Sequence, residues 1–214
     1  MKNITFQKVI PHPIKEGFKA TSTVWLSDID FIKNKKYMVT APSGRGKSTF
    51  LHIIYGLRKD YDGKVMLDNQ DVKNNSLNKW AEIRQTQLSI VFQNLRLFPQ
   101  LTGLENIQVK NQLSNTKTSE QVEMMAERLG VKDILQQEAG TMSYGQRQRI
   151  AIIRALCQPF SFLLLDEPFS HLDENNIEKA CTLIKEEIEA NQAGLLLVSL
   201  GEPYAFQYDE TIVL

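Results

Sequence analysis

The fold of this chain is decided by nine residues, Ala41-Pro42-Ser43-Gly44-Arg45-Gly46-Lys47-Ser48-Thr49. They follow an apolar run, Tyr37–Thr40, and precede Phe50 and Leu51, which begin an apolar pattern with helical spacing. A strand, a glycine-bearing loop and a helix in this order predict a P-loop, where backbone N–H groups and the helix N-terminus bind phosphate. We expect all nine residues to line a nucleotide site, with Lys47 at the β- and γ-phosphates and the Ser48 hydroxyl on Mg²⁺.

Composition sets the limits on the other kinds of protein this chain could be. Its 214 residues suit one domain with an inserted subdomain, and 25 Lys and Arg balance 25 Asp and Glu. The charges balance, so the composition gives no indication of direct binding to nucleic acid. No apolar run approaches the roughly 20 residues of a membrane span. The N-terminus does not resemble a secretory signal, so a cytoplasmic location is expected. Cys157 and Cys181 lie in helical patterns and are expected to be buried reduced thiols.

Apolar runs predict a mainly parallel sheet buried on both faces. The runs are Tyr37–Thr40, Leu88–Phe92, Phe162–Leu165 and Leu195–Ser199. The segment up to about Asp30 alternates weakly and contains turn residues, which favours short antiparallel strands. Residues 102–158 have helical spacing instead. We therefore predict one α/β domain over residues 1–214, with a nucleotide-binding core at about 1–101 and 159–214 and a helical subdomain at 102–158.

Two helix starts are marked by capping boxes. Thr118 is followed three residues later by Gln121, and Ser143 by Gln146; both pairs precede apolar residues at helical spacing. Gly130 is a plausible end for the first of these helices.

A second chemical motif stands at the end of the strand Phe162–Leu165, where Asp166 and Glu167 follow directly. The carboxyl end of a strand in an open α/β sheet is where ligands bind. We expect Asp166 to hold Mg²⁺ and Glu167 to orient and deprotonate an attacking water.

The segment Met142-Ser143-Tyr144-Gly145-Gln146 lies just before the acidic strand and resembles the Leu-Ser-Gly-Gly-Gln signature of the ABC (ATP-binding cassette) family. Two further segments agree with this resemblance. Val91-Phe92-Gln93-Asn94 is similar to the family's Q-loop, and Ser170-His171-Leu172-Asp173 to its D-loop.

The resemblance implies an ATPase of P-loop type that uses ATP and Mg²⁺. Gln93 would approach Mg²⁺ and the attacking water, and Asp173 would lie at a dimer interface. Ser143, Gly145 and Gln146 would contact the ATP of a second ABC subunit, because two such subunits pair head to tail. The second subunit would be an identical chain or a close relative.

Four positions depart from the usual pattern. Ala41 stands where the P-loop pattern begins with Gly. Tyr144 replaces the first of the paired signature glycines. Leu200 stands where a histidine that contacts the γ-phosphate is usual, after the last strand. The adenine-stacking aromatic is matched only approximately, by Phe18 or His12.

The resemblance leaves several functions open. The first is the ATPase subunit of a membrane transporter or related machine, held on the inner face of the membrane by a separate permease subunit. Residues 94–102 suit docking to this permease subunit. They resemble the corresponding segment in the lipoprotein-release, cell-division and importer branches of the ABC family. A soluble ATPase acting on DNA or ribosomes is disfavoured, because such relatives carry long coiled coils or two cassettes. A regulatory subunit with low turnover is the alternative that Leu200 suggests. The sequence does not identify the cargo, because cargo is expected to be recognised by other subunits.

Overall fold

The computed structural model describes residues 1–12, 22–42 and 44–214. Its larger sheet has five parallel strands in the order β6-β7-β8-β3-β9. Their bounds are Lys36–Thr40 for β3, Leu88–Val91 for β6, Phe162–Asp166 for β7, Gly194–Ser199 for β8 and Glu210–Val213 for β9. The first four match the predicted runs to within one residue at each end.

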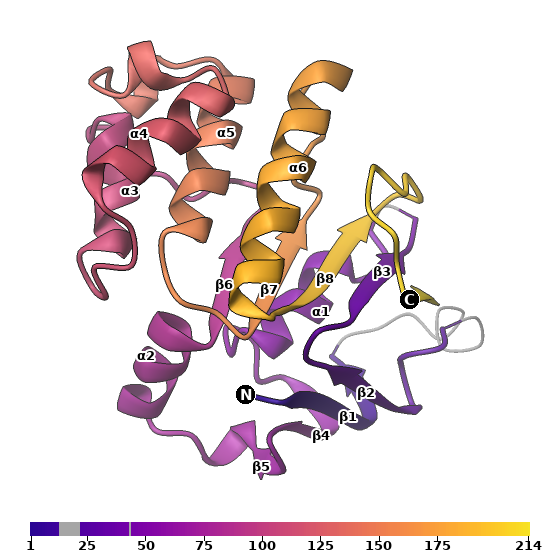
Figure 1. Ribbon diagram of the computed structural model, residues 1–214. Helices are drawn as coiled ribbons and strands as arrows, with labels where there is room; N and C mark the ends of the chain where they lie inside the picture. The colour runs from indigo at the N-terminus through magenta and orange to yellow at the C-terminus, as the bar shows by residue number, and fades with distance from the viewer. Residues whose placement is uncertain (13–21, 43) are drawn as a thin grey trace.

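Side chains of β7 alternate between two separate hydrophobic cores. Phe162 and Leu164 pack in one core with α1 (Lys47–Ile54), whereas Leu163 and Leu165 pack in the other with α6 (Glu174–Asn191). Successive residues of a strand point to opposite faces, so the two helices cover opposite sides of the sheet, as Figure 1 shows. Coverage of both faces explains why every residue of β7 and β8 is buried.

The N-terminal strands form a separate antiparallel sheet in the order β2-β1-β4-β5. Its strands are Asn3–Pro11 for β1, Asp28–Ile32 for β2, Tyr61–Leu67 for β4 and Gln70–Asp71 for β5. Phe6 and Phe31 pack edge to face, and both contact the ring of Phe50 on α1. This aromatic cluster fixes the antiparallel sheet against the helix that follows the P-loop.

Three helices between β6 and β7 begin at capping boxes. They are α3 (Gly103–Asn111), α4 (Ser119–Arg128) and α5 (Tyr144–Leu156), capped by Thr102, Thr118 and Ser143. The two predicted caps are thus confirmed, with a short 3₁₀ turn at each of Lys132–Ile134 and Ala139–Thr141 before α5. Helix α2 (Leu77–Thr86), which the sequence patterns did not predict, follows a 3₁₀ turn at Val72–Asn74 and is capped by Ser76.

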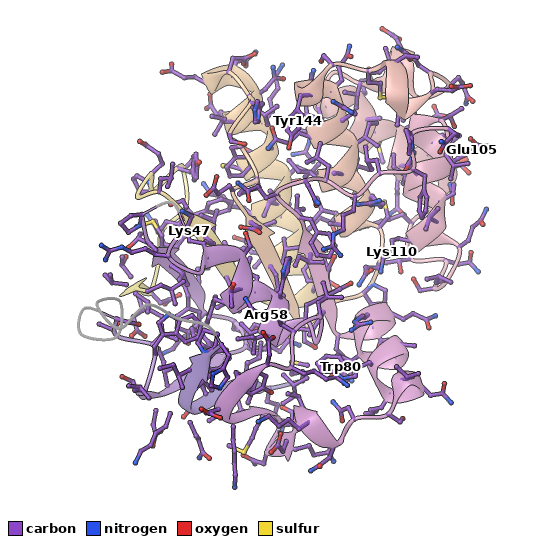
Figure 2. All side chains as sticks on the ribbon, turned by 180° about the vertical axis from the view of Figure 1, so that it is seen from behind. Lys47, Arg58, Trp80, Glu105, Lys110 and Tyr144 are labelled. Atoms are coloured by element: carbon purple, nitrogen blue, oxygen red, sulfur yellow. The ribbon has the colours of Figure 1, made fainter. Side chains whose placement is uncertain are left out.

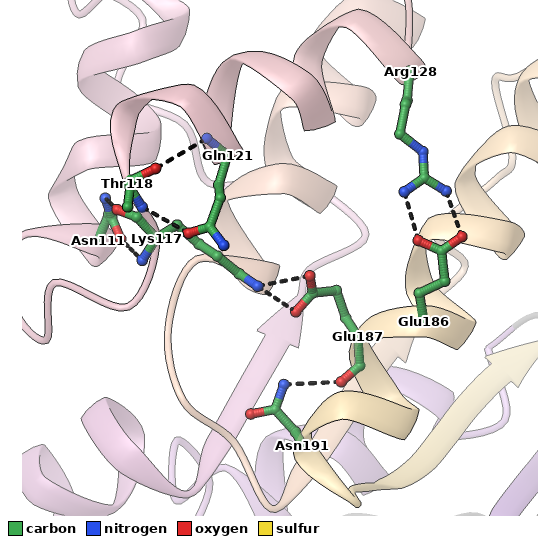
Figure 3. Close-up of polar contacts among 8 residues, drawn as sticks. All are labelled: Asn111, Lys117, Thr118, Gln121, Arg128, Glu186, Glu187 and Asn191. Atoms are coloured by element: carbon green, nitrogen blue, oxygen red, sulfur yellow. Dashed lines mark hydrogen bonds and ion pairs between the residues drawn. The ribbon is translucent and has the colours of Figure 1, made fainter.

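Two ion pairs join α6 to the segment around α4 (Figure 3). Lys117 Nζ donates to both carboxylate oxygens of Glu187 at 2.7 and 2.8 Å, and these side chains are 14% and 11% exposed. Arg128 donates to both oxygens of Glu186, but that pair is 41% and 53% exposed. The helices inserted before β7 are therefore tied to the core by one largely buried pair and one exposed pair.

Both cysteines are buried and free, as expected. Across the described ranges, no helix is both long enough and apolar enough to cross a bilayer.

Candidate functional site

The predicted P-loop leads from β3 into α1. Gly44 and Gly46 have φ of 75° and 92°, left-handed values that glycine adopts without steric cost. They turn the chain so that α1 begins at Lys47. The Lys47 side chain is 6% exposed, and its ammonium donates to Ala41 O at 3.0 Å. The other described residues of the motif surround this turn: Pro42 is exposed, whereas Arg45, Ser48 and Thr49 are half-buried. Ser43 lies outside the described residues.

The acidic residues that end β7 meet Lys47. Glu167 Oε1 lies 3.2 Å from Lys47 Nζ, and Gln93 Nε2 donates to Glu167 Oε2 at 3.2 Å. Glu167 has a φ of 48°, which is uncommon for a residue with a Cβ, and its N–H donates to Val198 O at 3.0 Å. The strained backbone turns this carboxylate towards the P-loop. Two predicted catalytic residues, Glu167 and Gln93, therefore lie together beside the predicted phosphate-binding lysine.

The residues predicted to bind Mg²⁺ converge at the same place. Ser48 Oγ lies 3.5 Å from Gln93 Oε1, and the buried Asp166 Oδ1 has no hydrogen-bond partner among the described residues. Burial raises the pKa of Asp166, and the charge of Glu167 adds to the rise, while Ser48 and Lys47 oppose it. Hydroxyl, amide and carboxylate oxygens are suitable Mg²⁺ ligands, and an unpartnered buried carboxylate oxygen fits a cation.

The predicted signature forms the start of α5. Ser143 Oγ accepts from Gln146 N at 3.2 Å, and Gln146 Oε1 accepts from Ser143 N at 2.8 Å. The Tyr144 hydroxyl donates to Gln93 O at 2.6 Å, and the Tyr144 ring lies 4.0 Å from the His171 ring. The predicted signature, Q-loop and D-loop are therefore in direct contact within one chain, a link that the sequence pattern did not indicate.

The segment that resembles a D-loop leads into α6. Asp173 caps that helix by accepting from Asn176 N at 2.9 Å, and this hydrogen bond lowers the pKa of Asp173. Gly145 packs closely against this loop, because a Cβ there would lie 2.9 Å from His171 O.

Arg58 is a residue at this site that the sequence reasoning missed. Its guanidinium donates to Thr49 Oγ1 at 2.9 Å, to His12 O and to the Asp60 carboxylate, joining the P-loop helix to the end of β1 (Figure 2). No local motif marks it, because two of its partners, Thr49 and His12, come from other segments. The His12 ring lies 3.0 Å from Asp62 and is half exposed. Phe18, the other residue predicted to stack on adenine, lies outside the described residues.

The ABC transporter family model matches residues 27–170, which include the P-loop, Gln93, the signature and the acidic strand. The chain belongs to the ABC transporter family. The lipoprotein-releasing system ATP-binding protein LolD of Legionella pneumophila (strain Lens) is 33% identical over 206 residues, which cover 94% of this chain and 91% of LolD. The glucose import ATP-binding protein GlcV of Saccharolobus solfataricus is 35% identical over 90% of this chain and 56% of its own length.

Solved ABC structures confirm the predicted fold class. The ATP-binding cassette MJ0796, in a dimeric post-hydrolysis state bound to ADP and Pi, superposes with a TM-score of 0.77 at 26% identity. The match covers 92% of this chain and 87% of MJ0796. A P-loop ATPase cassette with a parallel sheet, an antiparallel sheet and helices is thus the architecture of this chain.

The residue that follows β8 is Leu200, at the position where the resemblance to the family led us to expect a histidine. Leu200 is 63% exposed and offers no polar atom on its side chain. The neighbouring Ser199 is buried, and its hydroxyl donates to Glu202 O at 3.2 Å and accepts from Gly201 N at 3.1 Å. The Ser199 hydroxyl is therefore engaged in hydrogen bonds within the turn that follows β8.

Proposed function

We propose that this chain is the ATP-binding and ATP-hydrolysing subunit of an ABC membrane transporter or related membrane machine. It works as a head-to-tail dimer that drives a separate membrane subunit. The observation that carries the proposal is the cluster of Lys47, Glu167 and Gln93, placed beside Ser48 and Asp166 at the carboxyl end of β7. Membership of the ABC family supports ATP as the nucleotide.

The chemistry follows from these side chains. Lys47 places positive charge beside the transferring phosphoryl group, whose three oxygens share the negative charge in the transition state. Glu167 accepts a proton from the attacking water, and Gln93, already hydrogen-bonded to Glu167, helps to position that water. Ser48, Gln93 and Asp166 are the residues that would hold Mg²⁺, which supplies further positive charge to the phosphate oxygens when bound.

A dimer is proposed because each chain carries a second anion site. Ser143 and the free N–H groups of α5 form a helix N-terminus, and the same chain already has a phosphate cradle at Lys47. The signature at Ser143, Gly145 and Gln146 therefore serves the ATP of the other subunit, with Asp173 of the D-loop at the interface. The dimeric state of MJ0796 supports this arrangement.

A membrane partner is proposed from the relatives and from one exposed segment. LolD is an ATP-binding protein of a lipoprotein-releasing system, and GlcV of glucose import. Phe98 follows the Q-loop and is 51% exposed, although Asn106 Oδ1 accepts from its N–H at 2.8 Å and Asn106 Nδ2 donates to its carbonyl at 3.0 Å. A fixed backbone with an exposed aromatic ring suits a docking surface. The chain would then sit on the inner face of the cell membrane through this partner.

A regulatory ABC subunit with low turnover is the second candidate, and Leu200 is the observation that favours it. Neither Leu200 nor the engaged hydroxyl of Ser199 offers a free group for the γ-phosphate. A regulatory subunit of this kind would bind ATP and form the closed dimer, but it would hydrolyse ATP slowly.

The dimer can be tested with Glu167→Gln, which blocks hydrolysis and keeps the shape of the site. We expect sedimentation to show a monomer without nucleotide and a dimer with saturating ATP and Mg²⁺. The double variant Lys47→Ala/Glu167→Gln is the control and should stay monomeric. A Glu167→Gln chain that remains monomeric with ATP, and also with its membrane partner present, contradicts the head-to-tail model.

A further inference from the structure

Arg58 follows α1 and joins this helix to the residue after β1 (Figure 2). Its Nη1 donates to Thr49 Oγ1 at 2.9 Å, and its Nη2 donates to the carbonyl oxygen of His12. Its Nε and Nη2 also donate to the two carboxylate oxygens of Asp60, at 2.8 and 2.7 Å. The planar guanidinium presents its N–H donors in a fixed fork, so it can make these four hydrogen bonds together, whereas a lysine ammonium cannot.

The guanidinium is held in place and its charge is balanced. The N–H of Arg58 donates to His52 O at 3.2 Å, and His12 N donates to Asp60 O at 2.8 Å, so the backbone is fixed on both sides of the side chain. The hydrogen bonds from Arg58 lower the pKa of Asp60 to about 2, and the carboxylate is therefore ionised at neutral pH. Because Asp60 balances the charge of Arg58, the guanidinium offers Thr49 a fixed direction rather than an unpaired positive charge.

Thr49 is the last residue of the P-loop motif and the third residue of α1. The first backbone hydrogen bond of this helix runs from Phe50 N to Gly46 O, so the N–H groups of residues 47–49 have no acceptor within the helix. A Cβ on Gly46 would lie 4.0 Å from the Cβ of Thr49, which places the Thr49 side chain beside the loop glycine. The Thr49 hydroxyl therefore lies on the turn of α1 that borders the proposed phosphate site.

The hydrogen bond from Arg58 determines what the Thr49 hydroxyl can do. A hydroxyl carries one proton and accepts through its lone pairs. Since the Thr49 oxygen accepts from Arg58, its proton points away from the guanidinium. Within the described ranges, the Thr49 hydroxyl makes no hydrogen bond other than this one. Its proton is therefore left for a ligand.

We propose that Arg58 is a positioning residue for the nucleotide, because it holds the Thr49 hydroxyl as an acceptor and so directs the hydroxyl proton to a phosphate oxygen. The inference rests on the proposed function, and it adds to the phosphate site a residue from outside the P-loop motif. A hydrogen bond from a hydroxyl to an anionic oxygen is a strong one, and a donor that is already oriented loses less entropy when the ligand binds. Because His12 contacts the same guanidinium, the end of β1 is joined to this phosphate contact.

The test is a double-mutant cycle on the binding of a non-hydrolysable ATP analogue with Mg²⁺, measured by calorimetry on the whole chain. Thr49→Val removes the hydroxyl, keeps the branched shape, and should weaken binding about tenfold. Arg58→Gln should weaken binding by a similar factor in the parent chain. In the Thr49→Val chain it should weaken binding by less than about twofold, since its effect passes through the hydroxyl.

Conservative variants distinguish orientation from charge and from stability. Arg58→Lys keeps the positive charge but lacks the fork, so it should weaken binding as Arg58→Gln does. Thr49→Ser keeps the hydroxyl and should bind close to the parent. Arg84→Gln is the matched control, because Arg84 of α2 also holds backbone that follows α1, by donating to Tyr55 O and Gly56 O, each at 3.0 Å. It should change binding of the analogue little, while urea unfolding measures the stability that each variant loses.

The outcomes separate this inference from the proposed function. Equal losses from Arg58→Gln in the parent and in the Thr49→Val chain overturn the inference, because Arg58 then acts independently of the hydroxyl. Normal binding by Thr49→Val overturns it as well, and normal binding by Arg58→Lys overturns it in favour of charge alone. Arg58→Lys also completes the cycle if Arg58→Gln does not fold. A parent chain that does not bind the analogue refutes the proposed function itself.

Discussion

The two ion pairs on α6 provide a controlled comparison of buried and exposed charge. Both are bidentate and both join α6 to the segment around α4, but Lys117 and Glu187 are 14% and 11% exposed, against 41% and 53% for Arg128 and Glu186. Replacing Lys117 by Met leaves the Glu187 carboxylate without an ion-pair partner in a poorly hydrated site. Breaking a fully buried pair costs about 3–5 kcal/mol, and the residual exposure here reduces this to about 2–3 kcal/mol.

The exposed pair is expected to contribute much less. Arg128→Ala should cost less than about 1 kcal/mol, because water and salt already screen that charge. At about 2–4 °C per kcal/mol for a chain of this size, Lys117→Met should lower the Tm by roughly 5–10 °C and Arg128→Ala by at most a few degrees. Urea unfolding followed by circular dichroism measures the free energies of unfolding directly.

The double variant Lys117→Met/Glu187→Met distinguishes the loss of attraction between the two charges from the cost of leaving one buried charge without a partner. Its stability should return close to that of the parent, because no ion is left without a partner. Asn111 should keep residue 117 in place, since its side chain accepts from Lys117 N and donates to Lys117 O. Equal costs for Lys117→Met and Arg128→Ala, within about 0.5 kcal/mol, would refute the role assigned to burial.

Three further predictions concern the nucleotide site. Lys47→Ala should abolish ATP binding in calorimetry, since it removes the cation expected at the β- and γ-phosphates; undiminished binding would be incompatible with the site as described. Leu200→His should raise the single-turnover rate, by up to about 10²-fold if one oriented polar contact is restored, whereas an unchanged or lower rate would mean that the site does not lack that contact. Gly145→Ala should lower the free energy of unfolding by about 1–3 kcal/mol, because its Cβ would lie 2.9 Å from His171 O and the D-loop must shift; a neutral result in urea unfolding would argue against that tight packing.

Sequence patterns were sufficient wherever the determining signal is local. The apolar runs predicted four strands of the parallel sheet, and the boxes at Thr118 and Ser143 predicted two helix starts, because an apolar run and a capping box each consist of residues close in sequence. Helix α2 was not predicted, since its buried face rests on little more than Trp80 and Ile83.

The contacts that complete the site and join the inserted helices to the core depend on distant segments. The Tyr144 hydroxyl donates to Gln93 O, 51 residues away, and Lys117 pairs with Glu187 at a separation of 70 residues. In neither pair does a sequence motif around one residue indicate which residue it contacts. The residue-by-residue roles at the nucleotide site remain predictions, although the structure brings Lys47, Gln93 and Glu167 together.

The alternation of β7 between two cores has a consequence for how the molecule fluctuates. Phe162 and Leu164 are buried on one side, and Leu163 and Leu165 on the other, so neither core can open without exposing part of this strand. The amides of β7 should therefore be among the last to exchange with deuterium, and should do so only when the whole domain unfolds. Asp166 ends this slow-exchanging strand, and Glu167 is the first residue beyond it. The carboxylate proposed to activate water is thus attached directly to the least mobile part of the backbone, and Gln93 reaches it from a loop through the hydrogen bond to Glu167 Oε2.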